Sequence, residues 1–110
     1  MEGLVKGDVV VIPFPFSDLS ASKKRPGIIV ANLTGDDKII AQITSSANTD
    51  SYAIPLELKN FKSGKLPHSS KIRPNKLFTA DKSLISYKAG SISDKKIKEI
   101  EKELVKIFTN

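Results

Sequence analysis

The chain of 110 residues contains no cysteine and a single histidine, His68. The absence of cysteine excludes a disulfide framework, a thiolate nucleophile and a zinc site built on sulfur. Aromatic residues make up 6% of the chain, which argues against a large aromatic cage for a ligand. A mechanism that uses two histidines would need two copies of the chain.

Long apolar runs are also absent. No stretch approaches the roughly 20 apolar residues that a membrane-spanning helix needs. The N-terminal sequence MEGLVKGD lacks the order of basic and then apolar residues that is typical of a secretory signal. We therefore expect a cytoplasmic protein without a membrane partner.

The length of the chain supports one hydrophobic core, because a domain of this size buries roughly two-thirds of the surface of its unfolded chain. The sequence contains no internal repeat, low-complexity tract or interdomain linker. We expect a single domain over residues 1–110.

Positive charge is concentrated in one part of the chain. The formal net charge is +6, and between Lys59 and Lys88 eight cations stand against Asp81 alone, a local net charge of +7. Such a segment raises the rate of encounter with polyanions and supplies affinity that does not depend on sequence. Charge alone leaves two interpretations open, nucleic-acid binding and a lysine-rich surface that keeps the protein soluble.

The first half of the chain predicts four strands. Residues 8–16 are rich in β-branched and aromatic residues, and two prolines near the end of this segment indicate a strand that ends at, or bends near, a sheet edge. After a polar loop, further strands are predicted at residues 26–31, 39–44 and 52–58, with a turn at 34–37. In the last of these strands Ile54, Leu56 and Leu58 share one face, because side chains alternate along a strand.

The second half predicts a basic loop, an extended segment and a helix. Residues 59–70 are interrupted by glycine and proline and indicate an exposed loop, and residues 71–80 return to extended structure. Residues 94–108 place Ile97, Ile100, Leu104 and Ile107 at helical spacing, which predicts an amphipathic helix with Ser93 as its N-cap.

These elements favour a mainly β (α+β) fold. We expect a small SH3-like antiparallel β-barrel with the C-terminal amphipathic helix packed against it. The charged side of the helix is interpreted as its solvated face.

The segment KKRPGIIVAN, from Lys23 to Asn32, places consecutive cations directly before a strand. The later segment IIAQITSS ends an apolar run in hydroxyl groups, so Arg25 and Thr44 are expected at the margins of neighbouring strands. A guanidinium group and a hydroxyl group placed together suggest a phosphate site. The alternatives are that Arg25 pairs with Asp8 or Asp18, and that Thr44 is an ordinary strand residue.

Four segments together resemble the MazF/PemK toxins of type II toxin-antitoxin systems. The segments are GDVVVIPFPFSDLSASKKRPGIIVAN, IIAQITSS, SKIRPNKLFTADKSLI and a late GSIS before the helix. The most specific parts are Gly7-Asp8, Lys24-Arg25-Pro26 and Thr44-Ser45. Their occurrence in this order and at these separations is far more specific than any one of them. The sequence departs from the family pattern around Arg73, where many relatives have a threonine after the arginine.

The resemblance implies a homodimeric small barrel that cleaves single-stranded RNA without a metal or cofactor, and that is neutralised by a cognate antitoxin with a disordered binding segment. The implied products carry a 2′,3′-cyclic phosphate and a free 5′-hydroxyl. The family's catalytic roles fall on Arg25 and Thr44. The candidate RNA-binding residues are Ser17, Asp18, Ser20, Ser22, Lys23, Lys24, Ser45, Lys71, Arg73 and Lys76.

The chemistry of RNA cleavage sets the tasks of these side chains. The ribose 2′-hydroxyl attacks its own phosphate, which requires proton transfers at two oxygens and stabilisation of the negative charge on a phosphorane. Arg25 suits the stabilising task, because a guanidinium group stays charged and its planar donors match phosphate oxygens. His68, between Pro67 and Ser69, is interpreted as an exposed bystander. Phe14 and Phe16 either stack on bases or belong to the core.

Two other functions remain open from the sequence. One is a protein-binding poison on the same barrel, as in the CcdB relatives that bind DNA gyrase, for which the terminal helix would matter more than Arg25. The other is a non-catalytic RNA-binding module, for which the basic segment would suffice.

Overall fold

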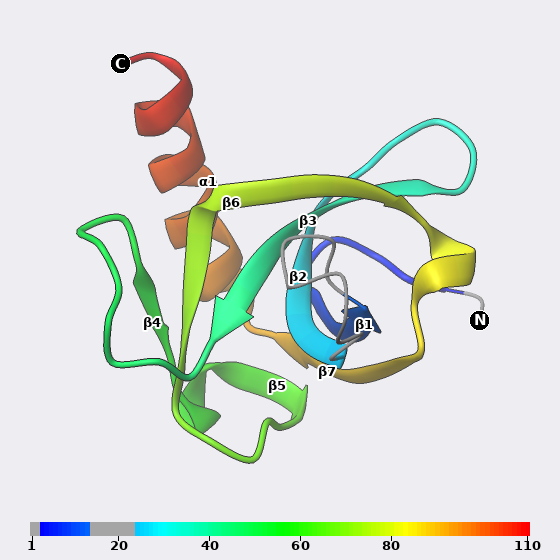
Figure 1. The fold of residues 1–110 in the computed structure, drawn as a ribbon, viewed down its shortest axis with the longest axis horizontal. Coiled ribbons are helices and arrows are strands. Elements are labelled where there is room, and N and C mark those ends of the chain that lie inside the picture. Colours follow the sequence, from blue (N-terminus) through cyan, green and yellow to red (C-terminus); the bar gives the residue numbers. More distant parts are fainter. Residues whose placement is uncertain (1–2, 14–23) are drawn as a thin grey trace.

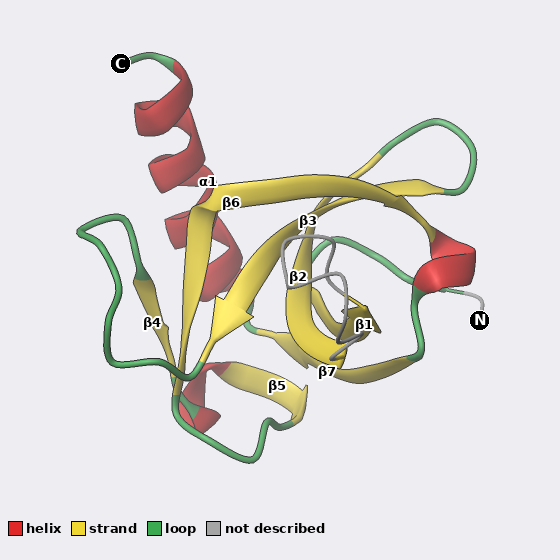
Figure 2. Ribbon diagram, in the orientation of Figure 1, coloured by secondary structure: helices red, strands yellow, loops and turns green. Residues whose placement is uncertain are grey.

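The structure is a computed structural model that describes residues 3–13 and 24–110. Within these residues the chain forms strands, two short 3-10 turns and one α-helix (Figures 1 and 2). The strands are β1 (Asp8–Pro13), β2 (Lys24–Asn32), β3 (Asp37–Thr44), β4 (Ile54–Leu56), β5 (Phe61–Gly64), β6 (Ser70–Asp81) and β7 (Tyr87–Ile92), and the helix is α1 (Asp94–Phe108). The 3-10 turns span Leu58–Asn60 and Lys82–Leu84.

All strand pairs are antiparallel and form one sheet in the order β4-β6-β3-β2-β1-β7-β5. The sheet curls into a half-barrel, and the long strand β6 arches over β3 and β2 (Figure 1). Register shifts interrupt several of the ladders, for example between Val9 and Val10 and between Ala41 and Gln42. Such irregularities bend strands and increase their twist, which is what curls a sheet of this size. The mainly β class with a C-terminal helix is therefore confirmed.

The curled sheet buries residues on both of its faces. Val9 and Ile28 belong to a cluster that includes Ile100 of the helix, whereas their neighbours Val10 and Ile29 belong to a second cluster with Leu4. Successive side chains of a strand point to opposite faces, so the central strands β1 and β2 support two cores at once. This explains why their sequences are continuous apolar runs and do not alternate.

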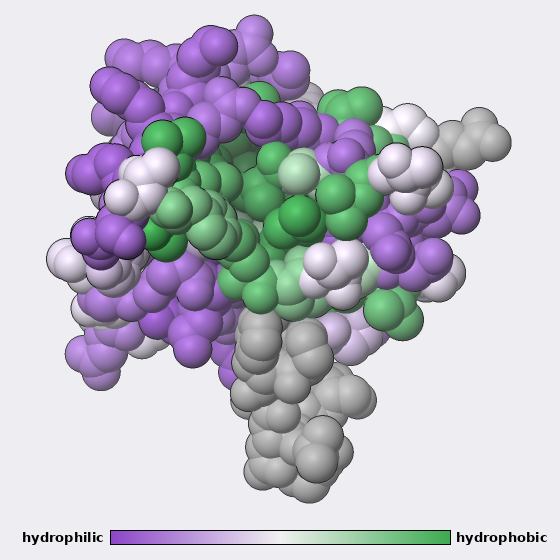
Figure 3. Space-filling model, turned by 90° about the horizontal axis from the view of Figure 1, so that it is seen from above, coloured by the Kyte–Doolittle hydropathy of each residue, from purple (hydrophilic) through white to green (hydrophobic). Residues whose placement is uncertain are grey.

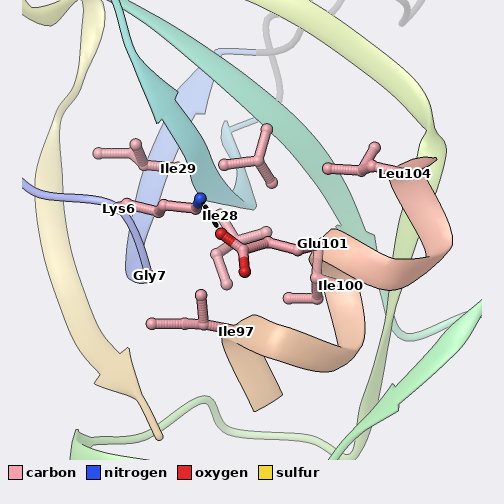
Figure 4. A pocket seen from close by; sticks show the side chains of 9 residues that line it. Lys6, Gly7, Ile28, Ile29, Ile97, Ile100, Glu101 and Leu104 are labelled. Carbon is pink, nitrogen blue, oxygen red and sulfur yellow. Dashed lines mark hydrogen bonds and ion pairs between the residues drawn. The ribbon is translucent and has the colours of Figure 1, made fainter. Parts of the chain in front are cut away.

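The helix α1 begins as expected, because the Ser93 side chain accepts a hydrogen bond from the backbone N–H of Lys96. It packs against β6 and β2. Ile97, Ile100 and Leu104 face the sheet around a small cavity of about 10 Å³ (Figure 4). The Lys96 ammonium donates to the Pro55 carbonyl oxygen at 3.0 Å, which links the helix to β4.

Asp8 is almost completely buried at the start of β1, with 1% of its surface exposed. Its carboxylate accepts hydrogen bonds from the Val5 backbone N–H and the Ser91 hydroxyl, and it forms an ion pair with Lys88 at 3.3 Å. The carboxylate thus joins the first and last strands in the sequence. The described partners of Asp8 do not include Arg25, so the first alternative for Arg25 is wrong; Asp18 lies outside the described residues.

Several predicted boundaries in the middle of the chain are wrong. The strand predicted at residues 52–58 is reduced to β4, and Leu58 lies in a 3-10 turn with 69% of its surface exposed. The predicted basic loop contains β5, and β7 was not predicted. Strand β5 has no buried residue, and among the described strands it pairs only with β7, so no local apolar pattern marks it.

One side of the molecule carries a broad apolar surface. Viewed from above Figure 1, toward the side where β6 and the end of α1 lie, apolar side chains gather in the middle of the face and hydrophilic ones surround them (Figure 3). Partly or fully exposed apolar residues of these two elements include Leu77, Phe78, Leu104, Val105, Ile107 and Phe108. None of the helices in the described part of the chain is long and apolar enough to cross a membrane.

Candidate functional site

Antiparallel pairing of β2 with β3 brings Arg25 and Thr44 together. Gly27 lies opposite Gln42, and each step along one strand of such a pair is matched by a step back along the other. The ladder between the two strands ends at this pair, two residues from Arg25 on β2 and two residues from Thr44, the last residue of β3. Arg25 lies opposite Ile12 of β1 and Thr44 opposite Lys71 of β6. The pairing therefore brings Arg25 and Thr44 to the same end of the sheet, just beyond the last paired residues of β2 and β3.

Both residues line one cavity of about 520 Å³ at this end of the half-barrel. Its wall is built from the ends of β2 and β3, the segment before β6 and the start of β7. Polar and ionisable side chains among the lining residues include Lys24, Arg25, Thr44, Ser45, His68 and Tyr87. No carboxylate is among the described residues that line it, so the fixed charges of the cavity are positive and favour an anionic ligand.

The Thr44 hydroxyl is held by the loop that follows β3. Its oxygen accepts a hydrogen bond from the Ser46 backbone N–H at 3.1 Å. In the same way the Ser46 hydroxyl accepts from the backbone N–H of Asn48, also at 3.1 Å. Because the Thr44 oxygen already has a donor, its own proton remains available for an oxygen in the cavity.

The Arg25 side chain has no ion-pair or hydrogen-bond partner within residues 3–13 and 24–110, although its backbone lies opposite Ile12 in the β1–β2 ladder. Its side chain is half-buried at the cavity wall. Its planar fork of donors is therefore not engaged by any described carboxylate, which suits a group that has to receive a phosphate.

Three of the predicted RNA-binding cations lie outside this cavity. The Lys71 ammonium donates to the Thr49 hydroxyl at 3.3 Å, although Lys71 lies opposite Thr44 in the β3–β6 ladder. Arg73 forms an ion pair with Asp50 at 3.2 Å, and Lys76 does not line the cavity. Five further RNA-binding candidates lie outside the described residues: Ser17, Asp18, Ser20, Ser22 and Lys23. Phe14 and Phe16 also lie outside them.

Asp50 organises the loop between β3 and β4. Its carboxylate accepts hydrogen bonds from the Asn75 amide at 2.8 Å, from Arg73 and from the Tyr52 backbone N–H. These bonds, that of Asn75 first, lower the pKa of Asp50 below its ordinary value of 3.8. The Arg73-Pro74-Asn75 segment therefore positions a loop in this chain and leaves the cavity to other residues.

His68 is exposed, as the sequence predicts, yet it lines the same cavity as Arg25 and Thr44. Its backbone carbonyl oxygen accepts a hydrogen bond from the Ser70 hydroxyl at 2.9 Å. Tyr87 lines the cavity from β7 and was missed by the sequence analysis, because only the pairing of Tyr87 with Val11 brings β7 there. Among the described residues, no three His, Cys, Asp or Glu side chains come together as a metal-binding group.

The cavity thus combines a guanidinium group and a hydroxyl group with positive charge. The sequence of the chain also matches a known protein family over nearly its whole length. Residues 5–108 match the family described as "PemK-like, MazF-like toxin of type II toxin-antitoxin system". The chain belongs to this family. Among curated proteins, none matches the sequence of the chain.

The fold of the chain is also similar to that of solved structures. The fold of this PemK/MazF-like chain is similar to that of "Endoribonuclease in complex with its cognate antitoxin from Mycobacterial species", with a TM-score of 0.76, 14% identity and coverage of 97% of this chain and 96% of that one. A second structure, "Endoribonuclease from Mycobacterial species", has a TM-score of 0.73 and 16% identity, and the match covers 99% of this chain and 94% of that one. A third structure, "Mycobacterium tuberculosis toxin MazF-mt6", has a TM-score of 0.72 and 13% identity, and the match covers 93% of this chain and 96% of that one. At these identities the likeness describes the fold.

Proposed function

We propose that this PemK/MazF-like toxin is an endoribonuclease that cleaves single-stranded RNA without a metal ion. The observation that carries the proposal is that Arg25 and Thr44 line one cavity whose described wall contains cations and hydroxyl groups but no carboxylate. Structures with the same fold are described as endoribonucleases, which agrees with this assignment.

In the proposed reaction the scissile phosphate lies between Arg25 and Thr44. The 2′-oxygen of the preceding ribose attacks the phosphorus, and the bond to the 5′-oxygen of the next nucleotide breaks. Arg25 neutralises the charge that accumulates on the equatorial oxygens of the phosphorane, and the Thr44 hydroxyl donates to one of them. The products carry a 2′,3′-cyclic phosphate and a free 5′-hydroxyl.

The RNA-contacting surface extends from the cavity along its basic rim. Lys24 and Ser45 flank Arg25 and Thr44 in the cavity wall, and we assign them contacts with neighbouring phosphates. Single-stranded RNA suits such a site, because its phosphates and 2′-hydroxyls are accessible without the opening of a duplex.

The fold and the exposed surface support two kinds of protein partner. We assign to the chain a cognate antitoxin with a disordered binding segment, by analogy with the similar structure described as a complex with its antitoxin. The apolar face of Figure 3 supports a homodimer, because contiguous exposed apolar area of this kind commonly marks a protein contact. The place of action that fits such a toxin is the cytoplasm.

The direct test is incubation of the purified protein with a labelled single-stranded RNA in EDTA. The proposal predicts cleavage, with cyclic phosphate and 5′-hydroxyl ends identified by mass spectrometry. Arg25→Ala should abolish cleavage with its melting temperature unchanged, whereas Lys59→Ala, which changes an exposed cation outside the cavity, should cleave like the wild type. A strict requirement for an added divalent metal would contradict the proposal.

The same variants separate the other functions. If Arg25→Ala stops neither cleavage nor growth inhibition, the site is misplaced. Growth inhibition without RNA cleavage would favour the gyrase-binding class. Salt-sensitive RNA binding without products would favour the non-catalytic binding module.

A further inference from the structure

The proposed cleavage needs a group that takes the proton from the attacking 2′-hydroxyl. A guanidinium group stays protonated under ordinary conditions, and a hydroxyl group is a weak base. Among the described residues of the cavity the ionisable side chains are those of Lys24, Arg25, His68 and Tyr87. Of these types only an imidazole is ordinarily half neutral close to physiological pH, so it alone combines an available lone pair with useful basicity.

We propose that His68 is the general base of the RNA cleavage, an inference that rests on the proposed function. His68 lies on the wall formed by the segment between β5 and β6, whereas Arg25 and Thr44 lie at the ends of β2 and β3. The imidazole therefore approaches a phosphate held by Arg25 and Thr44 from a separate element of the fold. A base from a separate wall can reach the 2′-hydroxyl while the other two groups hold the phosphate oxygens.

The register of β6 fixes where this segment enters the site. Lys71 lies opposite Thr44 in the β3–β6 ladder, and His68 precedes Lys71 by three residues, a span of at most about 10 Å of extended chain. The bond from the Ser70 hydroxyl to the His68 carbonyl oxygen ties the segment down at this point. Ser70 itself is buried and also lines the cavity.

His68 stands between this cavity and a second one of about 320 Å³, with Leu66 and Pro67 in the shared wall. The titratable and charged groups on the first side are Lys24, Arg25 and Tyr87, and those on the second side are Glu57 and Lys65. Glu57 forms an ion pair with Lys59. Among the described residues no carboxylate pairs with His68.

In the proposed step a neutral ring nitrogen of His68 takes the proton from the 2′-hydroxyl. The bond between the 2′-oxygen and phosphorus forms, and the bond between phosphorus and the 5′-oxygen breaks. The departing 5′-oxygen takes a proton from water, and the imidazolium later returns its proton to solvent. No oxidant, metal or co-substrate is needed for the balance.

The test compares single-turnover cleavage by the wild type, His68→Gln and His68→Ala over the pH range from 5 to 9. Removing a general base is expected to lower the rate about 10²- to 10⁴-fold. It should also abolish the rise in rate with pH that deprotonation of a general base produces. Added imidazole should partly restore His68→Ala. Affinity for an RNA with a 2′-deoxyribose at the cleavage position should stay within about twofold in both variants, because His68 acts on the reaction and not on binding.

Controls separate this inference from the proposed function. Lys65→Ala changes a cation in the same exposed segment and should keep the wild-type pH profile. Because His68 is exposed, His68→Gln and His68→Ala should both melt like the wild type. Unchanged rates and pH profiles in the His68 variants of an active enzyme would overturn the inference alone. If a 5′-bridging sulfur at the leaving group restores His68→Ala fully, His68 acts as an acid and the assignment as base is wrong. A wild type that cleaves no RNA would overturn the proposed function and this inference with it.

Discussion

Thr44 receives a hydrogen bond from the Ser46 backbone N–H at 3.1 Å, so the loop after β3 orients the hydroxyl that faces the cavity. The bond uses the oxygen of the hydroxyl and leaves its proton for a ligand. The hydroxyl is thus positioned before any substrate arrives, which avoids the cost of ordering it during the reaction.

Replacement of Thr44 tests this role directly. A hydrogen bond to a charged group contributes about 1.5–3 kcal/mol, so Thr44→Val should lower kcat/KM for RNA cleavage by about 10- to 100-fold. Thr44→Ser keeps the hydroxyl and should retain most of the activity. Kinetics on a labelled oligonucleotide provide the measurement.

Ser46→Ala is the matched control for Thr44. It removes a similar turn bond, that from Asn48 to the Ser46 hydroxyl, and leaves the Thr44 hydroxyl in place. It should have a small effect on the rate. Equal losses in Thr44→Ser and Thr44→Val would show that the hydroxyl is not the important group.

The sequence predicts those parts of the fold that depend on neighbours in the chain. The helix α1 follows from its apolar spacing and from Ser93, which caps it within one turn. Arg25 and Thr44 belong to successive strands joined by a short turn, so their proximity follows from local pairing. For this reason the sequence alone allows Arg25 and Thr44 to be proposed as a phosphate site.

Non-local pairing accounts for what the sequence could not predict. Tyr87 enters the cavity only because β7 pairs with β1 at the other end of the chain. The sequence indicates a bystander at His68 because it lies between Pro67 and Ser69 in a predicted loop, whereas its place in the cavity beside β2 and β3 depends on how β6 is placed. The sequence predicts that Leu58 shares a strand face with Ile54 and Leu56, but β4 ends before Leu58.

Asp8 is predicted to stabilise the fold and to take no part in the chemistry. Asp8→Ala removes the partner of the Val5 N–H, the Ser91 hydroxyl and Lys88. The expected loss is about 2–4 kcal/mol of unfolding free energy, measured by urea denaturation. Asp36→Ala removes an exposed ion pair with Lys82 and should cost at most about 0.5 kcal/mol. Equal losses in the two variants would contradict the structural role of Asp8.

Asp50 predicts a pH dependence of stability. Its pKa is lowered in the folded protein, chiefly by the Asn75 hydrogen bond and then by Arg73. A carboxylate with a lowered pKa contributes stability above its unfolded-state pKa, and this contribution is lost as the pH falls through the folded-state value. The difference in melting temperature between the wild type and Asp50→Asn should therefore be largest near neutral pH and shrink below about pH 4.

Thermal melts of both proteins between pH 2.5 and 7 provide this measurement. Asp36→Asn, which changes an exposed ion pair, should show a small difference at every pH. A difference for Asp50→Asn that stays constant across the range would mean that the ionised carboxylate is not what stabilises the loop.

The contact between β5 and β7 depends on Gly64, which has a φ of 70°. A Cβ at Gly64 would collide with the carbonyl oxygen of Ala89 and with the Cα of Gly90, both of them backbone atoms that cannot rotate away. Gly64→Ala should therefore destabilise the protein by more than the roughly 1–2 kcal/mol that a left-handed backbone costs a non-glycine residue. Gly35→Ala is the control, because Gly35 has a φ of 81° and nothing within 4 Å of the added Cβ. Urea denaturation should show a clearly larger loss for Gly64→Ala, since only this variant adds the collision to the backbone strain. Equal losses would mean that β5 can move away from β7 at little cost.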